Sequence, residues 1–215
     1  MTNTANRTFQ ISHQVHELSL DTDVSNLSES DKINTIAFHF RKIMEVLGLD
    51  LEDDSLRDTP SRVAKMYVRE IFSGLEPNNF PGISVFDNTY GYKEMLIERD
   101  IQVYSYCEHH FVPIVGKAHV AYFPSNKVIG LSKLNRVVKY FSRRPQVQER
   151  LTMDIANAMK EILQTEDIAV VIEAKHFCVA ARGIEDPKST TVTTHFGGQF
   201  ALQENKSAFY AHLKG

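Results

Sequence analysis

The chain has 215 residues, in which 24 Lys and Arg against 27 Asp and Glu give a formal charge of −3. Hydrophobic residues make up 42% and charged residues 24%, which is typical of a globular protein and excludes a disordered or fibrous chain. The near-neutral charge argues against a general nucleic-acid binder, and no apolar run reaches the roughly 18 residues of a membrane span. We therefore expect a cytoplasmic protein with neither a nucleic-acid nor a membrane partner.

The N-terminal part is predicted to be a polar tail followed by helices. Residues 1–30 are rich in Ser, Thr and Asn and show no apolar period, so we expect a flexible tail. Capping and breaking residues then mark two helices. The first is capped by Ser30 or Asp31 and runs to Leu47 before Gly48; the second has Thr59 as N-cap, Pro60 as first residue and its end near Phe72.

The rest of the chain changes between the period of strands and the period of helices. Strands are predicted around 97–103, 117–122, 167–176 and 189–196, and helices around 134–141, from Pro145 to about Ile162, and around 205–213. The order of helices, two strands, two helices and two strands indicates an α+β domain with helices on one face of an antiparallel sheet.

The densest chemical signal is a pair of cysteine and histidine motifs. Cys107 and His110 have the C-x-x-H spacing that lets a thiolate and an imidazole meet at one metal ion. Alone this motif is weak, because a buried cysteine beside exposed histidines is an equally good explanation. His176 and Cys178 lie two residues apart at the end of a predicted strand, so both side chains are expected to face one site. Cys178 then completes a set of three ligands and leaves a fourth position for water, whose pKa zinc lowers toward about 7.

Two neighbouring histidines and one acid complete this region. His109 and His176 are expected beside the metal without binding it, where they can donate and accept protons. Glu108 has two interpretations, either orienting a ligand or facing solvent. A disulfide between the two cysteines is possible, but free thiols, metal ligands or catalytic groups fit a reducing cytosol better.

A locally basic stretch suggests an anionic partner. Residues 127–150 contain seven basic side chains and a single acid, Glu149. Lys133 and Arg136 lie one helical turn apart and can hold phosphate oxygens, and Ser132 at the helix start adds a hydroxyl and backbone donors. The alternative is an ordinary solvated helix face.

The acid in this stretch has a possible role of its own. Glu149, beside Gln148, can accept two hydrogen bonds from a planar donor pair such as the edge of guanine. The alternative is a partner of the helix dipole near an N-terminus. Arg182, four residues after Cys178, is a further candidate phosphate ligand.

These residues resemble the GTP cyclohydrolase I family. The resemblance is carried by residues 105–152, which include SYCEHHFVPIVG and RRPQVQERLT, by DTPSRVAKMYVREIFSGL at 58–75, by HFCVAARGI at 176–184, and by the Thr-rich segment ending in Gly197-Gly198. It covers about 31–215 and leaves out the tail. The resemblance implies the tunnelling fold, with N-terminal helices at about 31–75 and a core at about 93–215.

The family resemblance also implies an activity and a role for each site residue. It implies a zinc enzyme, with one ion per subunit, that converts GTP and water to formate and 7,8-dihydroneopterin triphosphate, the first step of tetrahydrofolate and pterin biosynthesis. The implied roles are metal binding by Cys107, His110 and Cys178; acid–base chemistry by His109 and His176; a place near the ribose for Ser132; guanine binding by Gln148 and Glu149; and triphosphate binding by Lys133, Arg136, Arg182 and, from a neighbouring subunit, Arg62. The implied assembly is a ring-shaped homodecamer with its active sites between subunits.

Two departures and two alternatives remain. Phe177 and Ala180 stand where other members carry Tyr and Lys, which affects local packing or charge and no proposed ligand. One alternative is a different tunnelling-fold enzyme, either a pterin synthase relative, which uses histidine-rich zinc ligation, or a nitrile reductase with a nucleophilic cysteine. The other is a non-catalytic zinc or nucleotide-sensing protein.

Overall fold

The computed structural model describes residues 27–214, so most of the expected tail lies outside the described residues. Within them, no helix combines the length and the apolar composition needed to cross a membrane. The helices are α1 (Glu29–Val46), α2 (Thr59–Met66) with the π-helical η2 (Tyr67–Ile71), the short 3-10 helices η3 (Ser73–Leu75) and η4 (Pro77–Asn79), α3 (Leu131–Ser142), α4 (Gln148–Leu163), α5 (Phe177–Ala180), η5 (Gly198–Ala201) and α6 (Gln203–Leu213). The strands are β1 (Val85–Asp87), β2 (Leu96–Cys107), β3 (Pro113–Tyr122), β4 (Lys127–Ile129), β5 (Pro145–Gln146), β6 (Ile168–His176) and β7 (Thr191–Phe196).

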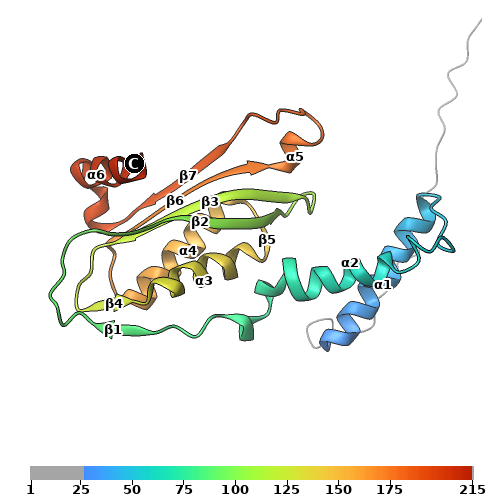
Figure 1. Cartoon of the computed structure of the whole chain (residues 1–215), viewed down its shortest axis with the longest axis horizontal. Coiled ribbons are helices and arrows are strands. Elements are labelled where there is room, and N and C mark those ends of the chain that lie inside the picture. Colours follow the sequence, from blue (N-terminus) through green and yellow to red (C-terminus); the bar gives the residue numbers. More distant parts are fainter. Residues whose placement is uncertain (1–26, 215) are drawn as a thin grey trace, which may run out of the picture.

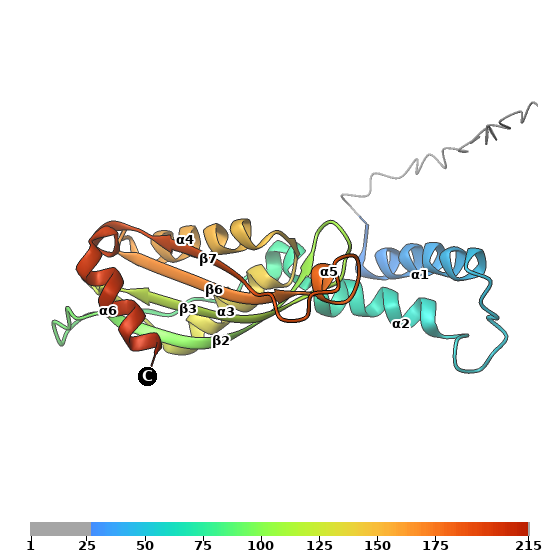
Figure 2. The same cartoon turned by 90° about the horizontal axis from the view of Figure 1, so that it is seen from above.

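One large sheet organises the molecule. In the part of the chain that the structure describes, this sheet has five strands in the order β5-β2-β3-β6-β7, and β1 pairs with β4 in a separate two-stranded sheet. All neighbours in the large sheet are antiparallel except β2 and β5, a short parallel pair that sequence analysis did not predict. Helices α3 and α4 cover one face, as the tunnelling fold requires, while α6 lies across the other face (Figure 1 and Figure 2).

The core lies on both faces of this sheet. Alternate residues of β2, β3 and β6 meet the apolar stripes of α3 and α4. This main cluster includes five fully buried residues: Val103, Val120, Ile172, Leu134 and Ile155. A smaller cluster on the opposite face joins Ala121, Ala169 and Val171 to Phe200 and Phe209. The second cluster explains why α6 packs on the face that we expected to be free of helices.

Helices α1 and α2 pack together as an arm that extends away from the sheet (Figure 1). The predicted cap of α1 is wrong by two or three residues, because Ser28 is the N-cap and its Oγ accepts the Asp31 N–H at 3.2 Å. The predicted end is confirmed: Gly48 has φ of 75°, which glycine adopts without steric cost.

Two other helix starts also differ from the prediction. Asp58, and not Thr59, occupies the N-cap of α2. Helix α4 begins at Gln148, because Pro145 and Gln146 first pair with the end of β2 as strand β5. The two strand residues delay the helix by three positions and bring its first turn to the end of β2, where the candidate site lies.

The arm meets the core at Gly74. The Gly74 N–H donates to the Arg143 carbonyl at 2.8 Å, and its carbonyl accepts from Arg144 Nε at 2.7 Å. A Cβ at this position would lie 2.1 Å from the carbonyl oxygen of Tyr140, so any larger residue would force the backbones apart. The glycine therefore allows the close contact between the arm and the end of α3.

Candidate active site

A tight turn at the end of β2 builds the first half of the site. Cys107 is the last strand residue, and its N–H donates to the Val112 carbonyl at 2.9 Å while its carbonyl accepts the Phe111 N–H at 2.8 Å. Phe111 has φ of 53°, a left-handed conformation that reverses the chain within the turn. Because of this reversal, the exposed His110 side chain lies beside the buried Cys107.

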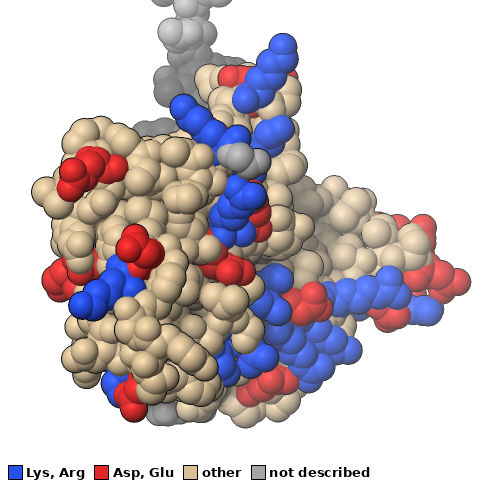
Figure 3. Space-filling model, turned by 60° about the vertical axis from the view of Figure 1, so that its left-hand side comes forward, with Lys and Arg blue, Asp and Glu red and all other residues tan. Residues whose placement is uncertain are grey.

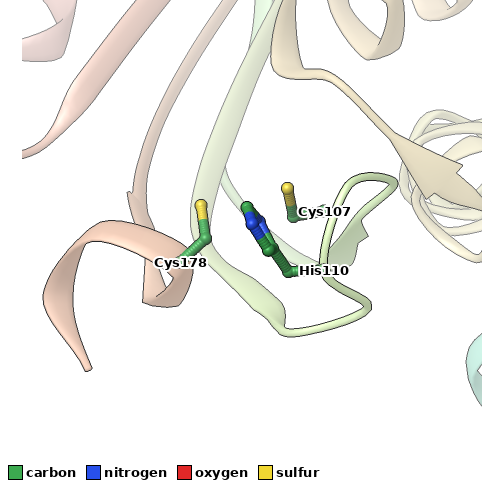
Figure 4. Close-up of side chains that lie close together, drawn as sticks. All are labelled: Cys107, His110 and Cys178. Carbon is green, nitrogen blue, oxygen red and sulfur yellow. The ribbon is translucent and has the colours of Figure 1, made fainter. Parts of the chain in front are cut away.

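Cys178 approaches the same point from helix α5 and not from a strand. Strand β6 pairs with β3 up to His176 but with β7 only up to Ala174, and beyond these ladder ends the chain turns into the helix. The prediction that His176 and Cys178 project together from a strand is therefore wrong. Even so, Cys178 lies beside Cys107 and His110 (Figure 4), and one ligand atom from each of these three residues lies within 4.8 Å of the other two.

These three residues, called the metal trio below, fit a divalent metal ion. Both cysteines are free, and burial together with the adjacent Cys107 raises the pKa of the Cys178 thiol. The Cys178 thiol, whose ionisation is disfavoured in the free chain, becomes a good ligand as a thiolate once a dication compensates its negative charge. Ligand atoms around one tetrahedral Zn²⁺ lie roughly 3.5–3.8 Å apart, so only a small contraction of the trio is needed.

Glu108 and His109 lie beside the metal trio and are held by a second group of polar side chains. Glu108 forms an ion pair with Arg150, whose Nε donates to Gln146 Oε1 at 2.9 Å. The other carboxylate oxygen of Glu108 lies 3.8 Å from His109 Nε2, and His109 Nδ1 lies 3.7 Å from Cys107 Sγ. Glu108 therefore matches neither interpretation fully, because it does not simply face solvent but contacts Arg150 and His109 and no member of the metal trio.

His176 lies at the end of β6 and contacts the start of α4. Its Nε2 is 2.7 Å from Oε1 of Gln148, the first residue of that helix. Burial lowers the pKa of His176, and the negative charge of Glu149 opposes this shift. Glu149 itself is exposed, whereas Gln148 is only 1% exposed. The two adjacent residues therefore face different surroundings.

Arg182 also reaches the metal trio. It follows α5 in the chain, and its Nη1 lies 3.0 Å from His110 Nε2. A residue that we expected to bind phosphate is therefore already next to a member of the metal trio within one chain.

Comparisons with known proteins agree with this arrangement. The family model described as GTP cyclohydrolase I matches residues 36–214. The chain belongs to the GTP cyclohydrolase I family. It is 53% identical over 195 residues to GTP cyclohydrolase 1 of Flavobacterium johnsoniae, covering 91% of this chain and 87% of that protein. It is 55% identical over 190 residues to GTP cyclohydrolase 1 of Aeromonas salmonicida, covering 88% and 87%. Like these relatives, this member of the GTP cyclohydrolase I family is an enzyme.

The remaining predicted site residues of this GTP cyclohydrolase I chain lie elsewhere. Ser132, Lys133 and Arg136 are in the first turns of α3, which starts after β4 at the end of the sheet opposite α5 (Figure 1). Arg62 is on α2 in the arm, where it lies 3.6 Å from Asp58. Lys and Arg side chains gather over part of the face in Figure 3, with Asp and Glu among them, so the positive charge is local. The single chain does not bring these residues to the metal trio.

Sequence analysis assigned no role to three residues that hold this site together. Arg150 pairs with Glu108 across 42 positions, and the Thr152 and Thr193 hydroxyls lie 2.7 Å apart beside Gln148. Arg150 was visible in the sequence only as one member of the basic stretch. No spacing rule relates a helix residue to a threonine on a distant strand, so only the fold identifies these partners.

Proposed function

We propose that this chain converts GTP and water to formate and 7,8-dihydroneopterin triphosphate with the help of one Zn²⁺ per subunit. The observation that carries the proposal is the convergence of Cys107, His110 and Cys178 in a chain of the GTP cyclohydrolase I family. A bound Zn²⁺ supplies Lewis acidity and lowers the pKa of a water molecule at its open position. Two thiolates and one imidazole favour zinc over magnesium or calcium, which prefer oxygen ligands.

The histidines beside the metal trio are proposed to move protons. Hydrolysis at C8 of the purine needs a proton for the departing ring nitrogen and a group that accepts a proton from water. His176 is half-buried with a lowered pKa, so its neutral form dominates at neutral pH and suits a base. His109 is exposed, and its Nε2 lies 3.8 Å from a carboxylate oxygen of Glu108, so it is within reach of substrate as the proposed acid.

Substrate binding is proposed to use charges around this centre. Glu149 is exposed in the first turn of α4, where its carboxylate can accept the two N–H donors on the edge of guanine. Arg182, Lys133, Arg136 and Arg62 are proposed to bind the triphosphate, and Ser132 to lie near the ribose. Binding of the remote triphosphate supplies energy that holds C8 at the reacting groups.

We propose that the complete site forms between copies of the chain. Lys133 and Arg136 start α3 at the far end of the sheet from α5, so one chain cannot place them with the metal trio. Strand β7 lies at one edge of the sheet, and β2 pairs with β5 only at Tyr106 and Cys107, so both edges offer strands for pairing with a neighbour. Head-to-tail pairing of β7 in one chain with β2 in the next can close a ring. We propose the homodecamer of the family as this assembly.

The cellular setting stays a proposal as well. Two free cysteines that must remain reduced to bind metal suit the cytoplasm. That the chain has no nucleic-acid or membrane partner stays a prediction.

The decisive experiment incubates the zinc-loaded protein with GTP and measures formate together with a fluorescent pterin after oxidation. Formate and pterin in equal amounts would support the proposal. Formate and pterin released without zinc would reject the role of the metal. GTP binding without either product would favour a nucleotide sensor, and neither binding nor product would favour another tunnelling-fold enzyme.

A further inference from the structure

Gln148 has a side-chain amide whose donors are already engaged inside the protein. Its Nε2 donates to the carbonyl oxygens of Ile172 and Thr191, each at 3.0 Å, and to Thr193 Oγ1 at 3.1 Å. The side chain is 1% exposed. Because an amide nitrogen carries two hydrogens and here meets three acceptors, it has no donor left for a ligand.

The neighbouring hydroxyl groups fix the direction of these hydrogen bonds. Thr152 Oγ1 donates to the backbone carbonyl of Gln148 at 2.9 Å. Since Thr152 has only one hydroxyl hydrogen, its contact with Thr193 at 2.7 Å must be donated by Thr193. Thr193 Oγ1 is then an acceptor toward Gln148. If the Gln148 amide were flipped, its Oε1 would face the two carbonyl oxygens and the lone pair of Thr193 Oγ1. This contact between acceptors is strongly unfavourable.

The orientation of the amide decides where His176 carries its hydrogen. Gln148 Oε1 faces His176 Nε2 at 2.7 Å, and an amide oxygen can only accept. We infer that Gln148 is a positioning residue that holds His176 in the tautomer with hydrogen on Nε2, which makes Nδ1 the ring atom that exchanges a proton with the substrate. This inference rests on the proposed function, in which His176 acts on GTP.

The position of Gln148 in the fold suits this role. Its hydrogen bonds connect the first turn of α4 with β6 and β7, so the amide that holds His176 is itself held by two strands. The next residue, Glu149, is exposed. The two neighbouring residues therefore have different roles: Glu149 is free to contact guanine, whereas Gln148 acts through His176.

Neutron diffraction from deuterium-exchanged crystals of the zinc-loaded protein tests the inference without any variant. The crystals are kept at a pH where histidine side chains are neutral. We expect a deuteron on His176 Nε2, none on Nδ1, and both Gln148 amide deuterons directed away from His176. A deuteron on Nδ1 alone would overturn the inference. The position of the deuteron does not depend on turnover. The tautomer inference can therefore be wrong while the protein still releases formate from GTP, and it can be right while no formate is released.

A variant separates positioning from substrate binding. Gln148→Met keeps the side-chain volume but cannot accept a hydrogen bond from His176. We expect ring-nitrogen NMR spectra of the ¹⁵N-histidine-labelled variant to show that the Nε2–H tautomer no longer dominates. We also expect kcat to fall about ten- to a hundredfold with a smaller change in KM for GTP. An unchanged tautomer with a raised KM would instead mean that Gln148 contacts the substrate, and would overturn the inference.

Gln146→Met is the matched control. Gln146 is also 1% exposed, and its amide donates to the Phe141 carbonyl at 3.2 Å and to Asp154 at 3.1 Å. Among the hydrogen bonds of the described residues, the partner of His176 is Gln148 and not Gln146, so this variant should lose comparable buried bonds while the His176 tautomer stays the same. If the His176 tautomer changed in both variants, the cause would be a general loosening of the site and not the loss of the Gln148 acceptor. That result would overturn the inference.

Discussion

Arg182 lies with Nη1 at 3.0 Å from Nε2 of His110, which links a proposed phosphate ligand to a proposed metal ligand. A guanidinium can only donate, so Nε2 holds a lone pair in this arrangement. A neutral imidazole bound to a metal has no second lone pair, because one nitrogen binds the ion and the other carries hydrogen. The Arg182 contact and the metal ion therefore exclude each other, and metal binding should release Arg182 for the substrate.

Arg182→Gln should bind Zn²⁺ as tightly as the unchanged protein or somewhat more tightly. The variant removes both a competitor for His110 and a positive charge near the cation. Its KM for GTP should rise about tenfold or more, because a charge-assisted bond to phosphate is lost. Competition with a chromophoric chelator gives the zinc affinity, and formate release gives KM. Zinc affinity that fell about tenfold or more would mean that Arg182 supports His110 as a ligand.

Cys178→Ser should lose bound zinc and formate release together, because a serine hydroxyl is a far weaker zinc ligand than a thiolate. His109→Gln is the matched comparison, since His109 adjoins the metal trio without belonging to it. This variant should keep one zinc per chain while kcat falls by about a hundredfold or more. Metal analysis and formate assays on both proteins check this, and full turnover by metal-free Cys178→Ser would reject the metal's role.

Glu149→Gln should weaken the choice of GTP over other purine nucleotides. An amide presents one acceptor and one donor where the carboxylate presents two acceptors, so it cannot pair with both N–H groups of guanine. We expect the preference for GTP over inosine triphosphate, which lacks the exocyclic amine, to fall about tenfold or more. The ratio of kcat/KM for the two nucleotides measures it. An unchanged ratio would show that Glu149 does not recognise guanine.

The order of elements and the metal trio could be predicted from the sequence because both leave local signals. Apolar periods and the glycine after α1 are properties of neighbouring residues, and the C-x-x-H spacing already places Cys107 near His110. Helix boundaries were less accurate where tertiary pairing intervened. The pairing of Pro145 with the end of β2 overrides the usual place of proline as a first helical residue.

Contacts between distant segments could not be predicted in the same way. The expected geometry at Cys178 assumed that β6 continues, but strand length depends on where β3 and β7 stop offering partners. Arg150 is 42 positions from its partner Glu108, and Thr193 is 45 positions from its partner Gln148. Such pairs depend on how α4 lies against the sheet, which no local pattern records.

Acid should destabilise the fold through His119, a 6% exposed residue whose Nδ1 accepts the Asp100 N–H at 3.2 Å. Burial is the main cause that lowers the pKa of His119; Lys117 and Arg99 add to it, while Asp100 and Glu173 oppose it. Below about pH 6.5 the unfolded chain therefore binds more protons than the folded one, so stability falls as pH decreases and is fully retained above this range.

The His119→Gln variant should keep an acceptor for the Asp100 N–H but lose this proton linkage. Its urea midpoint should decline less than that of the unchanged protein between about pH 7 and 5.5, with a residual decline from the half-buried His176 and His195, whose pKa values burial also lowers. Both proteins are compared at one concentration, because assembly also affects stability. Parallel declines would show that His119 does not contribute.

Two inactive variants should restore activity together if each site is built from two chains. Cys178→Ser damages the half that holds the metal, and Lys133→Ala damages the half that is proposed to bind phosphate at the start of α3. In randomly mixed oligomers at equal amounts, about a quarter of the sites combine two intact halves, so activity should recover toward that fraction. Co-expression with two different affinity tags, followed by tandem purification and a formate assay, measures it. If both halves belonged to the same chain, no mixed oligomer would hold an intact site and the purified mixture would stay inactive.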